Sequence, residues 1–211
     1  MKTMLKVSLA VLCALVLAGC GNRGFRFTVK AQVGYPNATY YLTPIGQPSN
    51  FYMKATSDSE GYVCFSGRSR YPMALSISDG CAKIVEPVFV EEGDVYVDRL
   101  KEDANVMVSH GTPSNDAYIQ YVVDLKALNS YFDTMINPDN RDIEREMIAA
   151  FDSLDRVVEA SNRDNVFGLY LFTTDGIRRC ADRAAVDSVV SLFSEPMREH
   201  PYMVDALKNA E

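Results

Sequence analysis

Apolar and polar residues alternate along the first part of the chain. From Phe25 to Val33 every second residue is apolar, and this period of two is typical of an antiparallel strand that buries one face. Further segments of the same kind follow, separated by turn residues such as Gly, Pro, Asn and Asp. The pattern predicts about eight strands, at residues 25–33, 39–43, 50–56, 62–66, 73–78, 85–90, 94–100 and 105–109.

Two turns within this region carry specific expectations. Gly93 closes the turn Glu91-Glu92-Gly93 and can adopt the positive φ that a tight turn requires. We expect the two glutamates there to face solvent. Residues 67–70 are expected to connect two strands of a hairpin, which Cys64 and Cys81 bracket.

After Pro113 the apolar residues recur at the spacing of an amphipathic helix. We expect this helix to cover the core of the strands, and Pro113-Ser114-Asn115 to offer polar side chains that cap its start. Its apolar positions are Tyr118, Tyr121, Val122, Leu125, Leu128, Phe132 and Met135.

Further helices follow. Asn137-Pro138-Asp139 predicts the start of the second one, and a shorter apolar piece spans Val166–Phe172. Asp182 is placed to cap a fourth helix, and Pro196 and Pro201 divide the remainder into two short turns.

Consecutive strands followed by consecutive helices predict an α+β fold. We expect an N-terminal antiparallel β-sandwich or barrel of about eight strands and a C-terminal helical segment. The expected divisions are a lipoprotein signal peptide at residues 1–19, a β-rich domain at 20–112 and a helical domain at 113–211.

The N-terminus has the pattern of a secretory signal peptide. Lys2 and Lys6 precede an apolar run at residues 7–18, which is too short to span a bilayer because spanning takes about 20 residues. The run ends in Leu17-Ala18-Gly19-Cys20, which matches the bacterial lipobox. We therefore expect Cys20 to carry fatty acyl chains such as palmitate and to anchor the protein in the cell envelope. Similar lipoproteins that are displayed on the cell surface often carry an acidic run after the lipidated Cys. No such run follows Cys20, so the resemblance to them favours the periplasmic face of the outer membrane.

The charge of the chain excludes one class of partner. The full sequence has a formal charge of −7, and residues 113–211 hold 10 basic and 18 acidic side chains, or −8. Such a negative surface repels phosphate backbones, so we expect no nucleic acid partner.

No catalytic motif stands out. Ser109, His110 and Asp116 supply the residue types of a hydrolase triad, but adjacent residues of one strand point to opposite faces. His110 and His200 are the only histidines, and neither lies in a metal-binding spacing. The sequence predicts no catalytic, cofactor-binding or metal-binding residue, and therefore a protein that is not an enzyme.

Three cysteines remain if Cys13 leaves with the signal and Cys20 is acylated. Cys64 and Cys81 are candidates for a disulfide, since envelope compartments are oxidising. The alternative is that all three behave as small buried apolar residues. Cys180 has basic neighbours that could lower the pKa of its thiol, but it has no second Cys nearby in sequence.

Aromatic residues crowd the strand-rich half. Exposed tyrosines could stack on sugar rings, whereas the simpler interpretation is that they fill a small β core. The residues concerned are Tyr35, Tyr40, Tyr41, Phe51, Tyr52, Tyr62 and Tyr71.

The order of short motifs resembles the family called domain of unknown function 4369, found in Gram-negative lipoproteins. The motifs are the lipobox, Tyr40-Tyr41-Leu42, the segment 61–67, the segment 89–95, Val108-Ser109-His110-Gly111-Thr112 and Asn115. In that family the β-rich part precedes a helical segment and a thioredoxin-like domain of the thiol–disulfide interchange type. This chain ends at Glu211 without Trp-Cys-x-x-Cys, so the resemblance assigns redox chemistry to none of its residues.

Three functions follow as expectations. The first is a non-catalytic, periplasm-facing lipoprotein that acts as an interaction or scaffold module for an unknown envelope protein. The alternatives are a module that binds a glycan or a peptide, and an accessory to a separate thioredoxin-like oxidoreductase.

Overall fold

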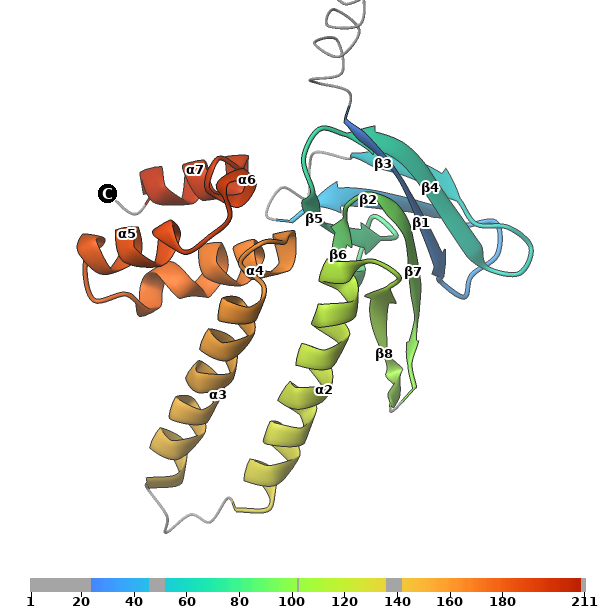
Figure 1. The fold of residues 1–211 in the computed structure, drawn as a ribbon. Coiled ribbons are helices and arrows are strands. Elements are labelled where there is room, and N and C mark those ends of the chain that lie inside the picture. Colours follow the sequence, from blue (N-terminus) through green and yellow to red (C-terminus); the bar gives the residue numbers. More distant parts are fainter. Residues whose placement is uncertain (1–23, 46–51, 102, 136–141, 210–211) are drawn as a thin grey trace, which may run out of the picture.

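The computed structural model describes residues 24–45, 52–101, 103–135 and 142–209. Two four-stranded sheets are followed by helices (Figure 1), which confirms the α+β class, and the sheets form a sandwich rather than a closed barrel. The strands are β1 (Phe25–Gln32), β2 (Thr39–Pro44), β3 (Met53–Thr56), β4 (Tyr62–Ser69), β5 (Met73–Ser78), β6 (Lys83–Val90), β7 (Gly93–Leu100) and β8 (Asp103–His110).

The first sheet has the order β4-β1-β7-β8 and the second has the order β3-β2-β5-β6. All pairs are antiparallel except β1 with β7, which is parallel, so the expectation of a purely antiparallel sandwich is wrong for this pair. Parallel neighbours need a long crossover connection. Here the connection runs from β2 to β6: β4 returns to the first sheet and pairs with β1, and the other four strands build the second sheet.

Two of the strand connections pass between the sheets. β6 is an edge strand of the second sheet and β7 belongs to the first, so the turn before Gly93 joins the two layers. Gly93 has the expected positive φ, at 126°. β4 and β5 also lie in different sheets, and β4 runs through to Ser69. The hairpin predicted between Cys64 and Cys81 is therefore wrong.

The core of the sandwich lies between the sheets and follows the alternation of the sequence. Its members come from both sheets and are almost inaccessible to solvent, which removes apolar surface from water and is the main source of stability in such a fold. They are Phe27, Val29, Ala31, Tyr40, Leu42, Val63, Phe65, Leu75, Ile77, Val85, Val88, Val90, Val95 and Val97.

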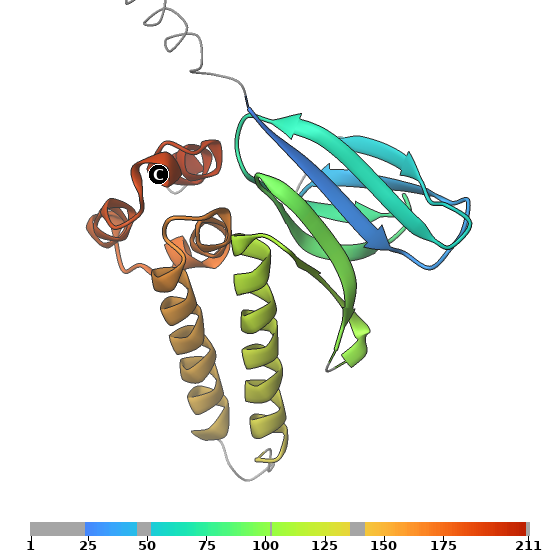
Figure 2. The same ribbon diagram turned by 45° about the vertical axis from the view of Figure 1, so that its right-hand side comes forward.

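The helical part lies beside the second sheet (Figures 1 and 2). Its α4 packs on the outer face of that sheet, where Ala74 of β5 and Phe89 of β6 join Val166, Phe167 and Leu171 in a second apolar cluster. Its elements are α2 (Pro113–Asp133), α3 (Asp142–Ser161), α4 (Val166–Leu171), the π-helix η1 (Phe172–Gly176), the 3-10 helix η2 (Ile177–Arg179), α5 (Arg183–Ser191), α6 (Glu195–Arg198) and α7 (Pro201–Asn209).

The helix signals have mixed outcomes. Asp182 caps α5 by accepting a hydrogen bond from Ala185 N at 2.8 Å, which confirms that prediction. Pro196 and Pro201 lie at the starts of α6 and α7, as expected from their fixed φ. The cap predicted at Asn137-Pro138-Asp139 lies outside the described residues.

The apolar face of α2 is covered less completely than its pattern predicts. Tyr118 packs edge-on against Phe89 of the second sheet, with ring centroids 5.8 Å apart. Further along, Phe132 contacts Phe151 of α3, and Met135 remains 40% exposed. The reason is visible in Figures 1 and 2, where the last turns of α2 run beyond the sandwich with α3 as their neighbour. None of the described helices is both long and apolar enough to span a membrane.

Candidate functional site

Asn115 fastens the start of α2 to the edge of the second sheet. Its amide donates to Phe89 O at 2.6 Å and accepts from Phe89 N at 2.9 Å, so it pairs with β6 much as a neighbouring strand would. The same amide accepts from Ser109 Oγ at 2.5 Å and donates to Thr112 Oγ1 at 2.7 Å. Both sheets and α2 therefore meet at one fully buried side chain.

Glu91 lies against the same helix start. Its carboxylate accepts from Ser114 N at 2.8 Å and from Ser114 Oγ at 2.9 Å, where the positive end of the helix dipole favours a negative charge. The expectation that Glu91 faces solvent is wrong, because it supplies the acceptor that the helix terminus needs. Thr112 occupies the N-cap position without a side-chain capping bond, so the predicted polar caps act on neighbouring segments instead.

The three residue types of a hydrolase triad do not form one. Ser109 is bound by Asn115, and His110 Nε2 lies 3.0 Å from Asp98 Oδ2 on the exposed side of the first sheet. Asp116 Oδ1 accepts from Gly111 N at 2.7 Å. Each side chain serves a different local contact, as the strand geometry predicts.

A cleft lies between the second sheet and the helices, with a volume of about 740 Å³. Ile45 and Ala74 form its sandwich wall, and segments of α4, η1, η2 and α7 form the other walls. The helical residues are Tyr170, Thr173, Thr174, Ile177, Arg178, Tyr202, Asp205, Ala206 and Asn209. A cleft of this size, mostly apolar with a few polar groups, has the character of a ligand site.

Two tyrosines set the chemistry of the cleft wall. Burial raises the pKa of Tyr170, and Glu86 and Asp175 raise it further. Burial also raises the pKa of Tyr202, against the effect of its hydrogen bond to Ala74 O at 3.4 Å. Both phenols therefore stay protonated and can donate hydrogen bonds at neutral pH. Neither is placed to act as a base.

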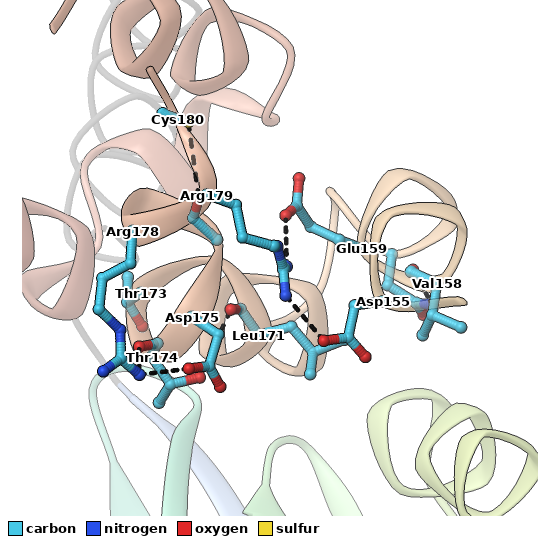
Figure 3. A network of polar contacts seen from close by, with 12 residues as sticks. Asp155, Val158, Glu159, Leu171, Thr173, Thr174, Asp175, Arg178, Arg179 and Cys180 are labelled. Atoms are coloured by element: carbon cyan, nitrogen blue, oxygen red, sulfur yellow. Dashed lines mark hydrogen bonds and ion pairs between the residues drawn. The ribbon is translucent and has the colours of Figure 1, made fainter. Parts of the chain in front are cut away.

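The exposed rim of the cleft is formed by η1 and η2. Arg178 binds Asp175 through its guanidinium group and donates to Thr174 O at 3.0 Å (Figure 3). The hydroxyls of Thr173 and Thr174 donate to carbonyls one turn back in the helix. A π-helix is rare and is often found at functional sites, and here it forms one wall of the cleft.

His200 attaches the start of α7 to the sandwich beside the cleft. Its Nε2 lies 2.8 Å from Pro72 O, and its Nδ1 accepts from Tyr202 N at 3.2 Å. These contacts fit a neutral ring that carries its proton on Nε2. Burial lowers the pKa of His200, although the bond to Pro72 opposes that effect. The position of Tyr202 in the cleft wall therefore depends on a neutral His200 imidazole.

On the other side of η1 and η2 lies a cluster of buried charges (Figure 3). Arg179 Nη1 bonds Asp155 Oδ2 at 2.7 Å, and its Nη2 lies 3.5 Å from Glu159 Oε2. Tyr121 donates to Asp155 Oδ1 at 2.7 Å, and burial together with this carboxylate raises the pKa of the phenol. A Cβ on Gly176 would lie 2.7 Å from Phe172 Cδ2 and 2.8 Å from Glu159 Oε2, so a larger residue there would have to displace these side chains.

The cysteines lie apart in the described residues. Cys64 faces outward on β4 and Cys81 lies in the exposed turn after β5, and both are free thiols in this structure. Cys180 is partly buried, and its Sγ is 3.5 Å from Gly176 O. Burial and Glu159 raise the pKa of Cys180 more than Arg156 and Arg179 lower it. The basic neighbours therefore do not activate this thiol. Cys20 lies outside the described residues.

The tyrosines of the strand-rich half do not share one environment. Tyr40 is a core residue with 1% exposure, whereas Tyr35 is 74% exposed. Tyr52 stacks on Phe27, and Tyr71 packs edge-on against His200. Only part of this group could therefore present a ring to a sugar.

The residues that the sequence missed are those of the cleft and the charged cluster. Neither has a recognisable spacing, because their members come from elements far apart in the chain, including β5, α3, α4, η1, η2, α5 and α7. Among the described residues no group of three or more His, Cys, Asp or Glu is placed to hold a metal ion. A comparison with models of known protein families finds no match, and a comparison with curated proteins finds no significant relative.

Proposed function

We propose that this protein is a non-catalytic lipoprotein of the bacterial cell envelope, anchored through Cys20, that holds a segment of another envelope protein in its cleft. The periplasmic face of the outer membrane is the proposed location. The single observation that carries the binding role is the cleft of about 740 Å³ between the second sheet and the helices. The lipobox carries the anchor.

The lining of the cleft supports a peptide as the bound segment. Ile45, Ala74 and Ile177 offer apolar contact, and the phenol of Tyr170 can donate a hydrogen bond. The phenol of Tyr202 already donates to Ala74 O and can accept one. Arg178 and Asp205 place one charge of each sign at the rim. Such a mixture suits a short peptide that buries an apolar side chain and pairs its own polar groups with the rim.

A glycan is the second candidate, and the two tyrosines of the cleft favour it. An aromatic ring in a cleft can stack on the apolar face of a sugar, and neighbouring polar groups then bind its hydroxyls. The two candidates can be distinguished by the molecule that the cleft binds, because a peptide segment belongs to a protein and a glycan does not.

Site-specific crosslinking in living cells tests the proposal. A photoreactive amino acid at Thr174, which is exposed at the rim, should yield one crosslinked protein band, and mass spectrometry would identify it. The same group at Glu60, in the exposed turn before β4, is the control and should not yield that band. An Ala206→Trp change should fill the cleft and abolish the band at Thr174.

The outcomes separate the candidates. A band that persists with Ala206→Trp, or that also forms from position 60, would exclude the cleft as the binding site. If Thr174 yields no protein product but the purified chain retains an oligosaccharide, the glycan candidate replaces the peptide. The anchor is tested separately, because a Cys20→Ala variant should move from the membrane fraction to the soluble fraction.

A further inference from the structure

Three arginines from separate segments converge on a small pocket on the side of η1 and η2 away from the cleft. Arg156 belongs to α3, Arg163 to the turn after α3, and Arg179 ends η2. The pocket has a volume of about 200 Å³. Its remaining lining consists of Glu159, Phe172, Gly176, Cys180 and Val189.

Two guanidinium nitrogens at this pocket are buried without a hydrogen-bond acceptor among the described residues. They are Arg163 Nε and Arg179 Nη2. Glu159 is shared between both arginines, at 3.5 Å from Arg163 Nη2 and 3.5 Å from Arg179 Nη2. One carboxylate at that distance cannot satisfy two guanidinium groups, and an unsatisfied buried donor is costly.

The charge balance of the pocket is opposite to that of the whole protein. Three arginines and one glutamate line it, whereas the full sequence carries −7. Asp155, the next carboxylate, already accepts hydrogen bonds from Tyr121 and Arg179. A guanidinium group presents parallel N–H donors that match the oxygens of a carboxylate or a phosphate.

We propose that this pocket binds a small oxyanion, either inorganic phosphate or a carboxylate group. An anion there would give Arg163 Nε and Arg179 Nη2 the acceptor that Glu159 does not supply. Arg156 is exposed and would close the open side of the pocket. The absence of a side chain at Gly176 keeps the π-helix from filling the space beside Glu159.

Isothermal titration of the purified full chain tests the proposal with two probes, sodium phosphate and sodium acetate. Sodium chloride keeps the ionic strength constant, because salt screens exposed charges. Saturable binding of phosphate that exceeds that of acetate supports a phosphate ligand. Saturable binding of acetate alone supports a carboxylate, such as the end of a peptide.

Variants then locate the binding. Arg163→Gln removes one unpartnered donor and should weaken binding by about tenfold or more, the effect of one lost charge-assisted hydrogen bond. Arg145→Gln is the matched control, because it removes an exposed arginine of α3 that pairs with Asp142. The affinity of this variant for the anion should equal that of the parent. If Arg163→Gln does not fold, Arg156→Gln serves instead and should weaken binding at least severalfold.

Two results would overturn the proposal. One is the absence of saturable binding for both probes, which would mean that solvent satisfies the two nitrogens. The other is equal affinity in the parent, Arg156→Gln and Arg163→Gln, which would place the anion elsewhere on the protein.

Discussion

The polar cluster around Asn115 and the cluster around Arg163 and Arg179 differ in how completely their groups are paired. At the start of α2, the Asn115 amide makes four hydrogen bonds and satisfies both backbone groups of Phe89. Beside η2, Arg163 and Arg179 each keep a buried nitrogen without an acceptor. A fully paired network rigidifies a fold, whereas an incompletely paired one marks a place where a ligand can contribute.

The difference assigns separate roles to the two halves of the helical part. The Asn115 cluster closes the edge of the second sheet and holds the sandwich, α2 and β8 together. The segment from Phe172 to Cys180 contributes to both the cleft and the arginine pocket. We therefore assign a structural role to the Asn115 cluster and a binding role to the segment from Phe172 to Cys180.

The largest expected effect comes from breaking the paired cluster. Asn115→Leu keeps a similar volume but leaves Phe89 N and Phe89 O without their side-chain partner, at a cost of about 1–3 kcal/mol for each unsatisfied group. Ser109 Oγ keeps Pro87 O as an acceptor, at 3.4 Å. We expect the free energy of unfolding to fall by about 3–5 kcal/mol, measured by urea denaturation. Asn129→Ala, an exposed change on the same helix, should stay within about 0.5 kcal/mol of the parent. Equal effects of the two variants would contradict the role of Asn115.

A smaller effect is expected at the charged cluster. Arg179→Gln leaves Asp155 and Glu159 without their shared cation, and both carboxylates are largely buried. Breaking such a pair costs about 3–5 kcal/mol when it is fully buried, and residual exposure reduces this to about 2 kcal/mol. Thermal unfolding should show the loss. A Tm within a degree of the parent would mean that the cluster contributes little to the fold.

Acidification should loosen α7 through His200. The folded state holds this imidazole neutral with a lowered pKa, so between that pKa and the unfolded value near 6.5 the unfolded chain binds more protons. The free energy of unfolding should be constant above pH 6.5 on account of this group and fall as the pH drops through that window. The free energy of unfolding can fall by up to about 1.4 kcal/mol per pH unit when unfolding takes up one proton.

His200→Gln provides the comparison for that experiment. It should be less stable than the parent at pH 8 and should lose the part of the slope that the imidazole supplies. His110→Gln, a change at the exposed histidine bound to Asp98, should keep the slope. If His200→Gln shows the parent's full slope, the pH dependence originates elsewhere.

The smallest expected signal is in thiol chemistry. Cys64 is an exposed thiol on β4, Cys81 is an exposed thiol in the turn after β5, and the pKa of Cys180 is raised. Dithiol exchange needs an accessible thiolate with a second thiol close by. We expect the purified chain to reduce insulin with dithiothreitol no faster than dithiothreitol alone. A faster rate that Cys64→Ser or Cys180→Ser abolishes would contradict a non-catalytic role.

The sequence predicts what is local and misses what depends on distant partners. The alternation from Phe25 onward predicts most strand bounds closely, because strand periodicity is a property of neighbouring residues. Sheet membership was not predictable, since β6 and β7 are joined by a short turn yet pair in different sheets. Turn residues predict where the chain reverses, but they do not specify with which strand each flanking segment pairs.

The candidate site shows the same limit. Asn115 resembles a helix cap in sequence, but its partners on β6 and β8 are known only once the sheets are assembled. Arg179 and Asp155 are separated by 24 positions and meet because η1 turns back toward α3. Charged residues on helices are usually solvated, so their composition gave no sign of a buried cluster.

Hydrogen exchange tests the contrast between the two clusters most directly. The amides of the parent chain would be followed by mass spectrometry with saturating sodium phosphate and, separately, with sodium acetate, each against sodium chloride at the same ionic strength. The account predicts that one of the two oxyanions slows exchange in residues 155–163 and 172–180, and that residues 87–91 and 109–115 do not change. Unchanged exchange in all four segments with both anions, or equal slowing in the Asn115 segments, would contradict it.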